Sequence, residues 1–249
     1  MTYSALIALV TLGDDLSRVN REKFSAWLRS LQEEDGSFRA VAFGSESDSR
    51  FVYSAAASCF LLQDWSGMDV PKSINYLCAC FNFNDGGFGL RPSQESHGGA
   101  TYTCLASLRL LGGLNALTTE QRNSAVTFCV LKQDSAQGGF SGRSNKVCDT
   151  CYAYWIGSSL HILGKGDFIN RAGLTRYLDT TSHPMIGGYA KCSGEAPDPY
   201  HTHFGICART LCEVDASKAM EPSLGLLRDA YDRHFQGVAM DAAQQLFIA

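Results

Sequence analysis

The sequence of 249 residues has no block of like charges and no excess of basic residues. Its formal net charge is −4, so it lacks the broad basic surface typical of proteins that bind nucleic acid. Long apolar runs are also absent. The stretch from Ala5 to Leu12 is too short to span a bilayer, and it lacks the basic leader and cleavage site of a secretory signal. We therefore expect no nucleic-acid partner and no membrane span.

The ten cysteines do not form the small, loop-rich framework that is typical of secreted disulfide proteins. They lie largely inside apolar helical patterns, as Cys59, Cys104, Cys129 and Cys207 do. This favours buried, reduced thiols in a cytoplasmic protein. The one CxxC, at residues 148–151, has no βαβ pattern around it, which argues against a redox dithiol or a zinc knuckle.

What the sequence does contain is a glycine-aromatic motif that recurs four times, at residues 36–38, 86–88, 138–140 and 187–189. A period of about 50 residues is typical of stacked supersecondary units, none of which buries its apolar face alone. A polar residue follows each motif at a similar offset: Arg50, His97, Asp149 and His201. The repeat therefore predicts that these four side chains reach one central site.

Each repeat is predicted to hold two helices. The first is apolar nearly all round and ends in glycine, as at residues 102–112 and 152–164, which is typical of a buried helix. The second is amphipathic, and its apolar residues recur at helical spacing. In residues 21–32 and 119–133 these are Phe24, Trp27, Leu28, Leu31, Val126, Phe128, Val130 and Leu131.

Strand-like alternation is scarce, so these patterns predict an all-α fold, a closed ring of helical hairpins with an inner and an outer ring of helices. We expect one domain over residues 1–249, with four full units and part of a fifth by about Val214. Residues 235–249 carry no repeat signal and are expected to be an irregular tail.

Two neighbouring inner-helix starts carry possible zinc ligands. Asp149 and Cys151 begin one, and His201 and His203 begin the next; composition alone does not separate the two histidines. Three protein ligands with a fourth position open is the arrangement of catalytic zinc. The alternative is a helix-capping aspartate beside a buried cysteine.

A second group could bind an anion. His97 precedes two glycines, and Arg143 and Lys146 lie just before Asp149, with Tyr152 inside the helix; these suggest a diphosphate site. The alternative is a solvated basic loop. Aromatic residues on the inner helices could line an apolar channel or simply fill the core: Tyr53, Tyr102, Tyr154, Trp155 and Phe204. The acidic loop Ser193–Asp198 carries no clear signal.

Together these residues resemble the β subunits of the protein prenyltransferases. The resemblance covers most of the chain, to about Val214, and rests on motifs in the family's order: 86–88, 95–99, 142–146, 149–152 and 200–202. Within the family the chain is most similar to the β subunits of protein geranylgeranyltransferase type I. Three stretches look characteristic of that type: 13–19, 32–38 and 65–69.

The resemblance implies an α-α toroid that pairs with a separate α subunit. It implies one zinc ion (Zn²⁺) per heterodimer, held by Asp149, Cys151 and His201. It also implies transfer of geranylgeranyl from geranylgeranyl diphosphate to the cysteine of C-terminal CaaX motifs, such as those of small GTPases. His97, Arg143, Lys146 and Tyr152 would hold the diphosphate. The isoprenoid pocket would be lined by Arg50, Tyr53, Tyr102, Trp155 and Phe204.

Lys191 is similar in position to an aspartate that helps hold Mg²⁺ in farnesyltransferase, so we predict turnover without Mg²⁺. Relative to the family, the resemblance implies a chain truncated at its N-terminus and a ring incomplete there. Rival interpretations are a Rab-type or farnesyl-specific relative, a truncated β-like chain that binds an α subunit without turnover, and a class II terpene cyclase, which the absence of a DxDD motif disfavours.

Overall fold

The computed structural model describes residues 2–212 and 219–236, and the chain within them is mostly helical. Five helices lie around the centre: α1 (Thr2–Thr11), α3 (Ser49–Leu62), α5 (Gly98–Leu110), α7 (Thr150–Ile162) and α9 (Pro199–Cys212). The connecting and outer helices are α2 (Arg21–Arg29), α4 (Val70–Ala79), α6 (Thr119–Val130), α8 (Arg171–Thr181) and α10 (Arg228–Phe235), with 3-10 turns at Leu114–Ala116 and Gly166–Phe168.

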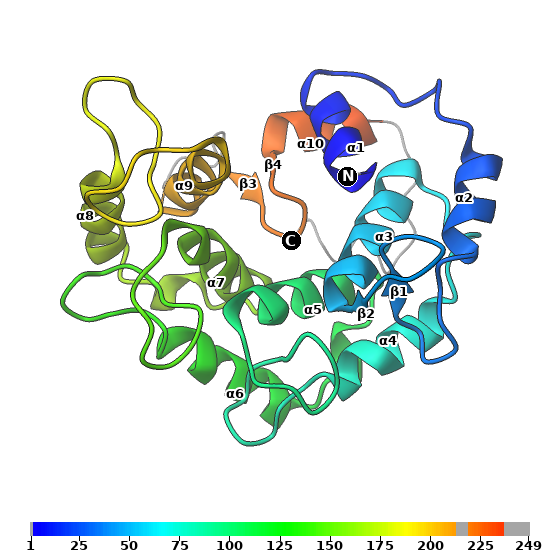
Figure 1. Ribbon diagram of the computed structural model, residues 1–249, viewed down its shortest axis with the longest axis horizontal. Coiled ribbons are helices and arrows are strands. Elements are labelled where there is room, and N and C mark those ends of the chain that lie inside the picture. The colour runs from blue at the N-terminus through cyan, green and yellow to red at the C-terminus, as the bar shows by residue number, and fades with distance from the viewer. Residues whose placement is uncertain (1, 213–218, 237–249) are drawn as a thin grey trace.

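The five central helices form an inner arc in which each helix packs against the next (Figure 1). Helices α3, α5 and α7 are buried on nearly all sides, which explains why their sequences are apolar throughout. The predicted all-α toroid is confirmed. It differs from the expected ring of uniform hairpins in one sector: between α9 and α1 lie α10 and a small antiparallel sheet of β3 (Met220–Glu221) and β4 (Leu226–Leu227).

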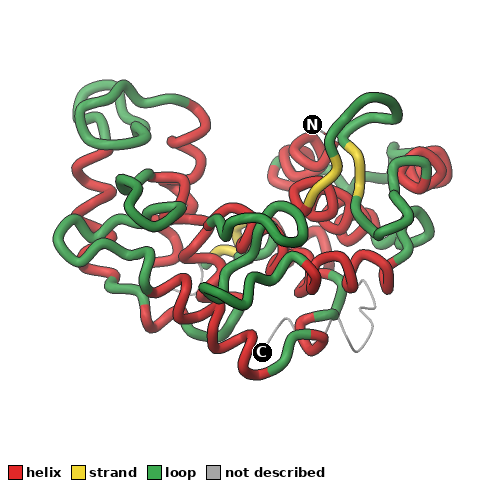
Figure 2. The backbone as a smooth tube through the Cα atoms, turned by 60° about the horizontal axis from the view of Figure 1, so that its bottom comes forward, coloured by secondary structure: helices red, strands yellow, loops and turns green. Residues whose placement is uncertain are grey.

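A second two-stranded sheet, β1 (Phe38–Arg39) with β2 (Ser47–Asp48), leads into α3. Figure 2 shows this hairpin projecting beyond the helices. Among the described residues no helix is both long and apolar enough to cross a bilayer. Phe235, where the irregular tail was expected to begin, is buried at the end of α10; Val214 and residues 237–249 lie outside the described residues.

The outer helices bury one face, as their spacing predicts, but two expected core residues are exposed. Leu28, Leu31 and Phe128 are buried. Leu131 is 74% exposed; it keeps helical dihedrals but lies four residues after the exposed Thr127, on the solvent face of α6, so its predicted place on the apolar face is wrong. Trp27 is 43% exposed and lies beside Phe24 at the solvent edge of α2.

The glycine turns explain the period of the repeat. Gly36 and Gly138 have φ values of +91° and +84°, which favour glycine. A Cβ at Gly36 would lie 2.2 Å from the carbonyl oxygen of Lys72, and one at Gly138 would lie 2.2 Å from that of Gly173. Each turn therefore packs directly on the outer helix of the next unit, and a side chain there would separate the units.

The β3–β4 hairpin closes one end of the arc and is held by tyrosine hydroxyls. One tyrosine from each of the first four inner helices takes part: Tyr3, Tyr53, Tyr102 and Tyr154. Neighbouring hydroxyl oxygens in this series are 2.7, 3.1 and 2.9 Å apart. Each hydroxyl also lies 2.7–3.1 Å from a backbone carbonyl of residues 222–224. The repeat thus places these four hydroxyls in a row, here called the tyrosine ladder, which binds residues 222–224, a segment outside the repeat.

Candidate active site

The inner helices α3, α5, α7 and α9 begin at the same end of the arc, and each begins with a polar capping side chain. These caps are Asp48, His97, Asp149 and Asp198. Each accepts a hydrogen bond of 2.9–3.1 Å from a backbone N–H two or three residues further on. Stacking of the repeat therefore gathers four capping groups, and the residues just after them, at one place.

A cavity of about 690 Å³ lies at this place. Most of the predicted site residues line it: Arg50, Tyr53, His97, Tyr102, Asp149, Cys151, Tyr152, Trp155, Lys191, His201 and Phe204. The four polar residues that follow the glycine motifs are thus brought together. Arg50 is held in place by a two-point contact with the buried carboxylate of Asp48, at 3.0 and 2.6 Å.

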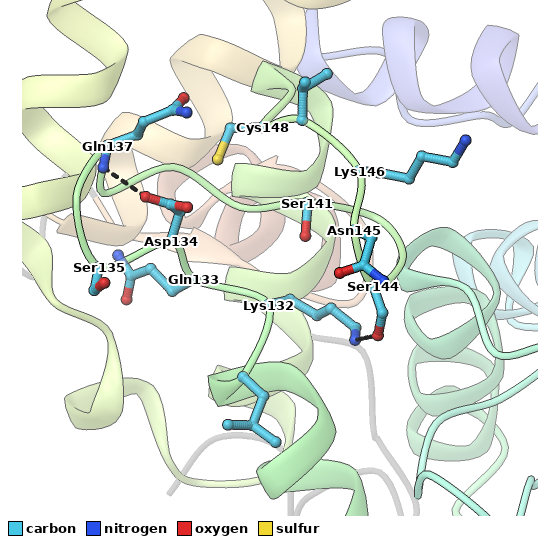
Figure 3. Close-up of a pocket in the computed structure, with 12 residues that line it drawn as sticks. Lys132, Gln133, Asp134, Ser135, Gln137, Ser141, Ser144, Asn145, Lys146 and Cys148 are labelled. Atoms are coloured by element: carbon cyan, nitrogen blue, oxygen red, sulfur yellow. Dashed lines mark hydrogen bonds between the residues drawn. The ribbon is translucent and has the colours of Figure 1, made fainter.

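Arg143 and Lys146 do not line this cavity. The Arg143 guanidinium pairs with the Glu95 carboxylate at 3.2 Å, and Lys146 lines a separate polar pocket (Figure 3). Their loop nevertheless lies beside the site, because the Gly142 carbonyl accepts a 2.8 Å hydrogen bond from the Gly98 N–H at the start of α5. Asn145, in the exposed part of this loop, has a φ of +60° and so lies in the left-handed region.

Asp149, Cys151 and His201 form a cluster of possible metal ligands. One donor atom from each lies within 4.8 Å of the others. The His201 Nε2 and the Asp149 Oδ1 are 3.4 Å apart. Zinc bonds of about 2.0–2.3 Å in a tetrahedron place donor atoms roughly 3.4–3.8 Å apart. The residues therefore fit a zinc ion, and all three line the cavity wall, where a ligand could approach an ion that they held.

His201, rather than His203, is the histidine of this cluster. Its Nδ1 lies 2.6 Å from an Asp198 carboxylate oxygen, so the proton sits on Nδ1 and the Nε2 lone pair faces Asp149 and Cys151. The hydrogen bond from His201 lowers the pKa of Asp198. His203 turns elsewhere, with its Nε2 3.6 Å from the Cys207 sulfur. Sequence reasoning missed Asp198, although its place in the repeat, equivalent to Asp149, could have identified it.

Cys151 is almost completely buried. Burial, and then the negative charge of Asp149, raise the pKa of its thiol well above the usual value. A thiolate at this position therefore requires a cation, since burial disfavours an uncompensated charge. The donor set of carboxylate, sulfur and imidazole suits zinc.

His97 and Tyr152 form a polar pair beside the cluster. The His97 Nδ1 accepts a hydrogen bond from the Gly99 N–H, so the proton of the neutral ring sits on Nε2, which lies 2.8 Å from the Tyr152 hydroxyl. Burial, and then the Arg143 guanidinium, lower the pKa of His97 and favour this neutral form. The Tyr152 hydroxyl accepts from His97 and keeps its own proton to donate to an anion; burial raises its pKa to about 12.

A second cavity, of about 820 Å³, adjoins the first and is mainly apolar. Tyr53, Tyr102, Trp155 and Phe204 line both cavities, and Leu224 of the β3–β4 hairpin contributes to the wall of the second. Tyr154 lines the second cavity but not the first, and its ring stacks on that of Phe204 with ring centroids 5.4 Å apart. The predicted aromatic channel thus lies between the polar end of the arc and its closing hairpin.

Comparison with known proteins agrees with this architecture. The chain is 42% identical over 233 residues to the geranylgeranyl transferase type-1 subunit beta of Arabidopsis thaliana, which covers 90% of this chain and 61% of the relative. It is 37% identical to the protein of the same name from Dictyostelium discoideum, over 92% of this chain and 64% of the relative. The chain thus spans less than two thirds of the length of these relatives.

Among solved structures, Candida albicans protein geranylgeranyltransferase-I complexed with GGPP matches with a TM-score of 0.85. The match covers 96% of this chain and 74% of that chain at 23% sequence identity, and it shows a shared fold. The prenyltransferase alpha-alpha toroid domain family matches residues 1–226. The repeat, the arc of inner helices and this match together show that the chain belongs to the prenyltransferase α-α toroid domain family.

Proposed function

We propose that this chain is the zinc-dependent β subunit of a protein geranylgeranyltransferase type I. In this reaction the thiolate of a C-terminal CaaX cysteine attacks C1 of geranylgeranyl diphosphate. A carbon–sulfur bond forms as the C1–oxygen bond breaks, and its electron pair leaves with the diphosphate. The observation that carries the proposal is the cluster of Asp149, Cys151 and His201 on the wall of a cavity that continues into an apolar channel.

Asp149, Cys151 and His201 would hold the zinc ion. When bound there, zinc lowers the pKa of an acceptor thiol so that a nucleophile exists at neutral pH. Asp198 keeps the proton on the His201 Nδ1 and so keeps Nε2 available as a ligand.

The departing diphosphate would be held by His97, Tyr152, Arg143 and Lys146. The Tyr152 hydroxyl, which accepts from His97, donates to the developing negative charge. Arg143 would reach the diphosphate by leaving its surface ion pair with Glu95, which is easily exchanged, and the exposed Lys146 side chain would turn toward it. The exposed Lys191 ammonium, on the cavity wall, would supply the positive charge that Mg²⁺ supplies elsewhere.

The lipid would lie along the aromatic channel, between Tyr53, Tyr102, Trp155 and Phe204, with Arg50 near its polar end. These walls exclude water and bury the apolar chain, which is the main source of affinity for such a ligand. The acceptor proteins would be CaaX proteins such as small GTPases. The partner would be a prenyltransferase α subunit, since the relatives are named as β subunits.

The test is the zinc content of the chain co-expressed with an α subunit. We expect one zinc per heterodimer, lost in Cys151→Ala and kept in Cys148→Ala, a matched control because Cys148 is also buried but stands outside the ligand cluster. The zinc-loaded heterodimer should then transfer geranylgeranyl to a CaaX peptide faster than farnesyl. Absence of zinc from the wild type, or its retention in Cys151→Ala, would contradict the proposal.

A further inference from the structure

Lys132 is a buried lysine in the outer layer, just after α6. The residue as a whole is only 8% exposed. Within residues 2–212 and 219–236 its ammonium has no carboxylate within ion-pair distance. The ammonium instead lies 4.5 Å from the centre of the Phe128 ring and donates a 3.0 Å hydrogen bond to the Ser144 hydroxyl.

A buried cation without a counter-charge is costly. An ammonium loses part of its hydration on burial, and a cation–π contact, one hydroxyl and the polar pocket that Lys132 lines replace that hydration only in part. Leucine or methionine at this position would fill the same space without the penalty, as replacement of buried charges by apolar residues often does. Packing alone therefore does not account for a lysine here.

The hydrogen bond of Lys132 ends on the loop that carries the two proposed diphosphate ligands. Ser144 lies between Arg143 and Lys146. Figure 3 shows the Lys132 side chain extended across a polar pocket to Ser144, whereas Lys146 points away from it. The ammonium thus binds the middle of the loop, while on either side the Arg143 guanidinium pairs with Glu95 at the surface and Lys146 points away from the pocket.

The loop has few other ties. Residues 144–147 are exposed, and the Lys146 N–H to Arg143 carbonyl hydrogen bond is long, at 3.4 Å. The backbone is anchored before the loop by two hydrogen bonds, from the Gly98 N–H to the Gly142 carbonyl at 2.8 Å and from the Ser141 N–H to the Lys132 carbonyl at 3.0 Å. After the loop it is anchored by the bridge between Ser141 and Cys148. Asn145 is in the left-handed region, which this residue type tolerates but does not strongly prefer.

We propose that Lys132 is a positioning residue that fixes the loop 142–146 for diphosphate binding. The inference rests on the proposed function. Lys132 does not touch the substrate; it limits the conformations of the loop so that less entropy is lost when Arg143 and Lys146 engage the diphosphate.

The test uses the heterodimer with an α subunit, and measures steady-state kinetics together with the Kd of geranylgeranyl diphosphate. In Lys132→Met we expect KM and Kd for this substrate to rise about tenfold, the size of effect when one charged hydrogen bond that orders a loop is lost, with kcat within about twofold. Lys132→Arg should restore most of the affinity, because it keeps the cation and the donor.

Ser144→Ala separates positioning from simple electrostatics, since it removes the acceptor and keeps the charge. It should reproduce the loss seen in Lys132→Met, and the double variant should be no worse than either single variant. Lys165→Met is the matched control, because Lys165 also lies over an aromatic ring, that of Phe168 at 5.8 Å, but is exposed and makes no contact with the loop.

Hydrogen exchange of the amides of residues 143–147 gives a readout without substrate, and it should be several-fold faster in Lys132→Met than in the wild type or Lys165→Met. If the wild type binds the substrate, then unchanged hydrogen exchange in Lys132→Met, or an unchanged Kd in that variant, would overturn the role of Lys132 but not the proposed function. A normal Kd in Ser144→Ala beside a raised one in Lys132→Met would also overturn it. A wild-type heterodimer that binds no geranylgeranyl diphosphate would overturn the proposed function and the inference together.

Discussion

The tyrosine ladder makes a prediction in which two chemically identical substitutions have different costs. Four hydroxyls carry four protons and face three carbonyls, those of Pro222, Ser223 and Leu224, so one donor is to spare. The Pro222 carbonyl has two possible donors, Tyr102 and Tyr154, at 3.1 Å each. The Ser223 carbonyl is contacted by Tyr53 alone, at 2.9 Å.

Tyr53→Phe therefore leaves a buried carbonyl without a donor, which costs about 2 kcal/mol of the free energy of unfolding. Tyr102→Phe removes a hydroxyl from an equally buried ring but leaves Tyr154 to serve Pro222, so we expect a cost of about 1 kcal/mol or less. At roughly 2–4 °C per kcal/mol for a chain of this size, Tm should fall by about 4–8 °C and by less than about 4 °C respectively.

Guanidinium and thermal unfolding, followed by far-ultraviolet circular dichroism, measure both variants against the wild type. Both substitutions remove one hydroxyl from an inner-helix tyrosine, so each serves as the control for the other. If Tyr102→Phe proved as costly as Tyr53→Phe, the hydroxyls would not be satisfying the hairpin carbonyls as described, and the packing of the rings alone would hold the hairpin.

Four further outcomes are expected. Ser223→Ala should leave the free energy of unfolding unchanged or raise it, because the buried Ser223 hydroxyl has no partner among the described residues; a loss of more than about 1 kcal/mol in guanidinium unfolding would contradict this. Asp198→Asn should weaken zinc affinity about 10- to 100-fold in a chelator competition, because the His201 Nδ1 loses its carboxylate, and unaltered affinity would refute that role. Added Mg²⁺ should not change the rate of transfer, and a several-fold rise would show that the Lys191 argument is wrong. Burial lowers the pKa of His97, so His97 contributes stability that is present above about pH 6.5 and is lost as pH falls through its folded-state pKa. His97→Asn keeps a capping side chain but removes this titration, so its free energy of unfolding should depend less on pH below about pH 6.5.

Much of the site was accessible to sequence reasoning because the protein repeats. Arg50, His97, Asp149 and His201 occupy similar places in successive units, and stacking brings similar places together without further information. Helix capping explains where the zinc-ligand candidates of α7 lie. The Asp149 carboxylate accepts a hydrogen bond from the Cys151 N–H at the start of its own helix, and both residues line the cavity.

Other features depended on contacts between distant parts of the chain. The β3–β4 hairpin is gripped by tyrosines that precede it by 68 to 221 residues, and no local pattern in residues 219–227 indicates this. The prediction for Leu131 was wrong because this apolar residue continues the helical geometry on the solvent face, four residues after the exposed Thr127. The burial of Lys132 went unnoticed, since a lysine among polar residues is normally solvated.

The sequence by itself determined the period of the units, the inner and outer helices and the set of residues at the inner-helix starts, because apolar spacing, glycine turns and caps act within a few residues. Only the tertiary structure decided that His201 rather than His203 faces Asp149 and Cys151, that Arg143 and Lys146 lie outside the cavity, and that a hairpin outside the repeat closes the arc. These outcomes depend on which surfaces meet when separate units pack, and the side-chain directions that decide them are set by neighbours remote in the chain.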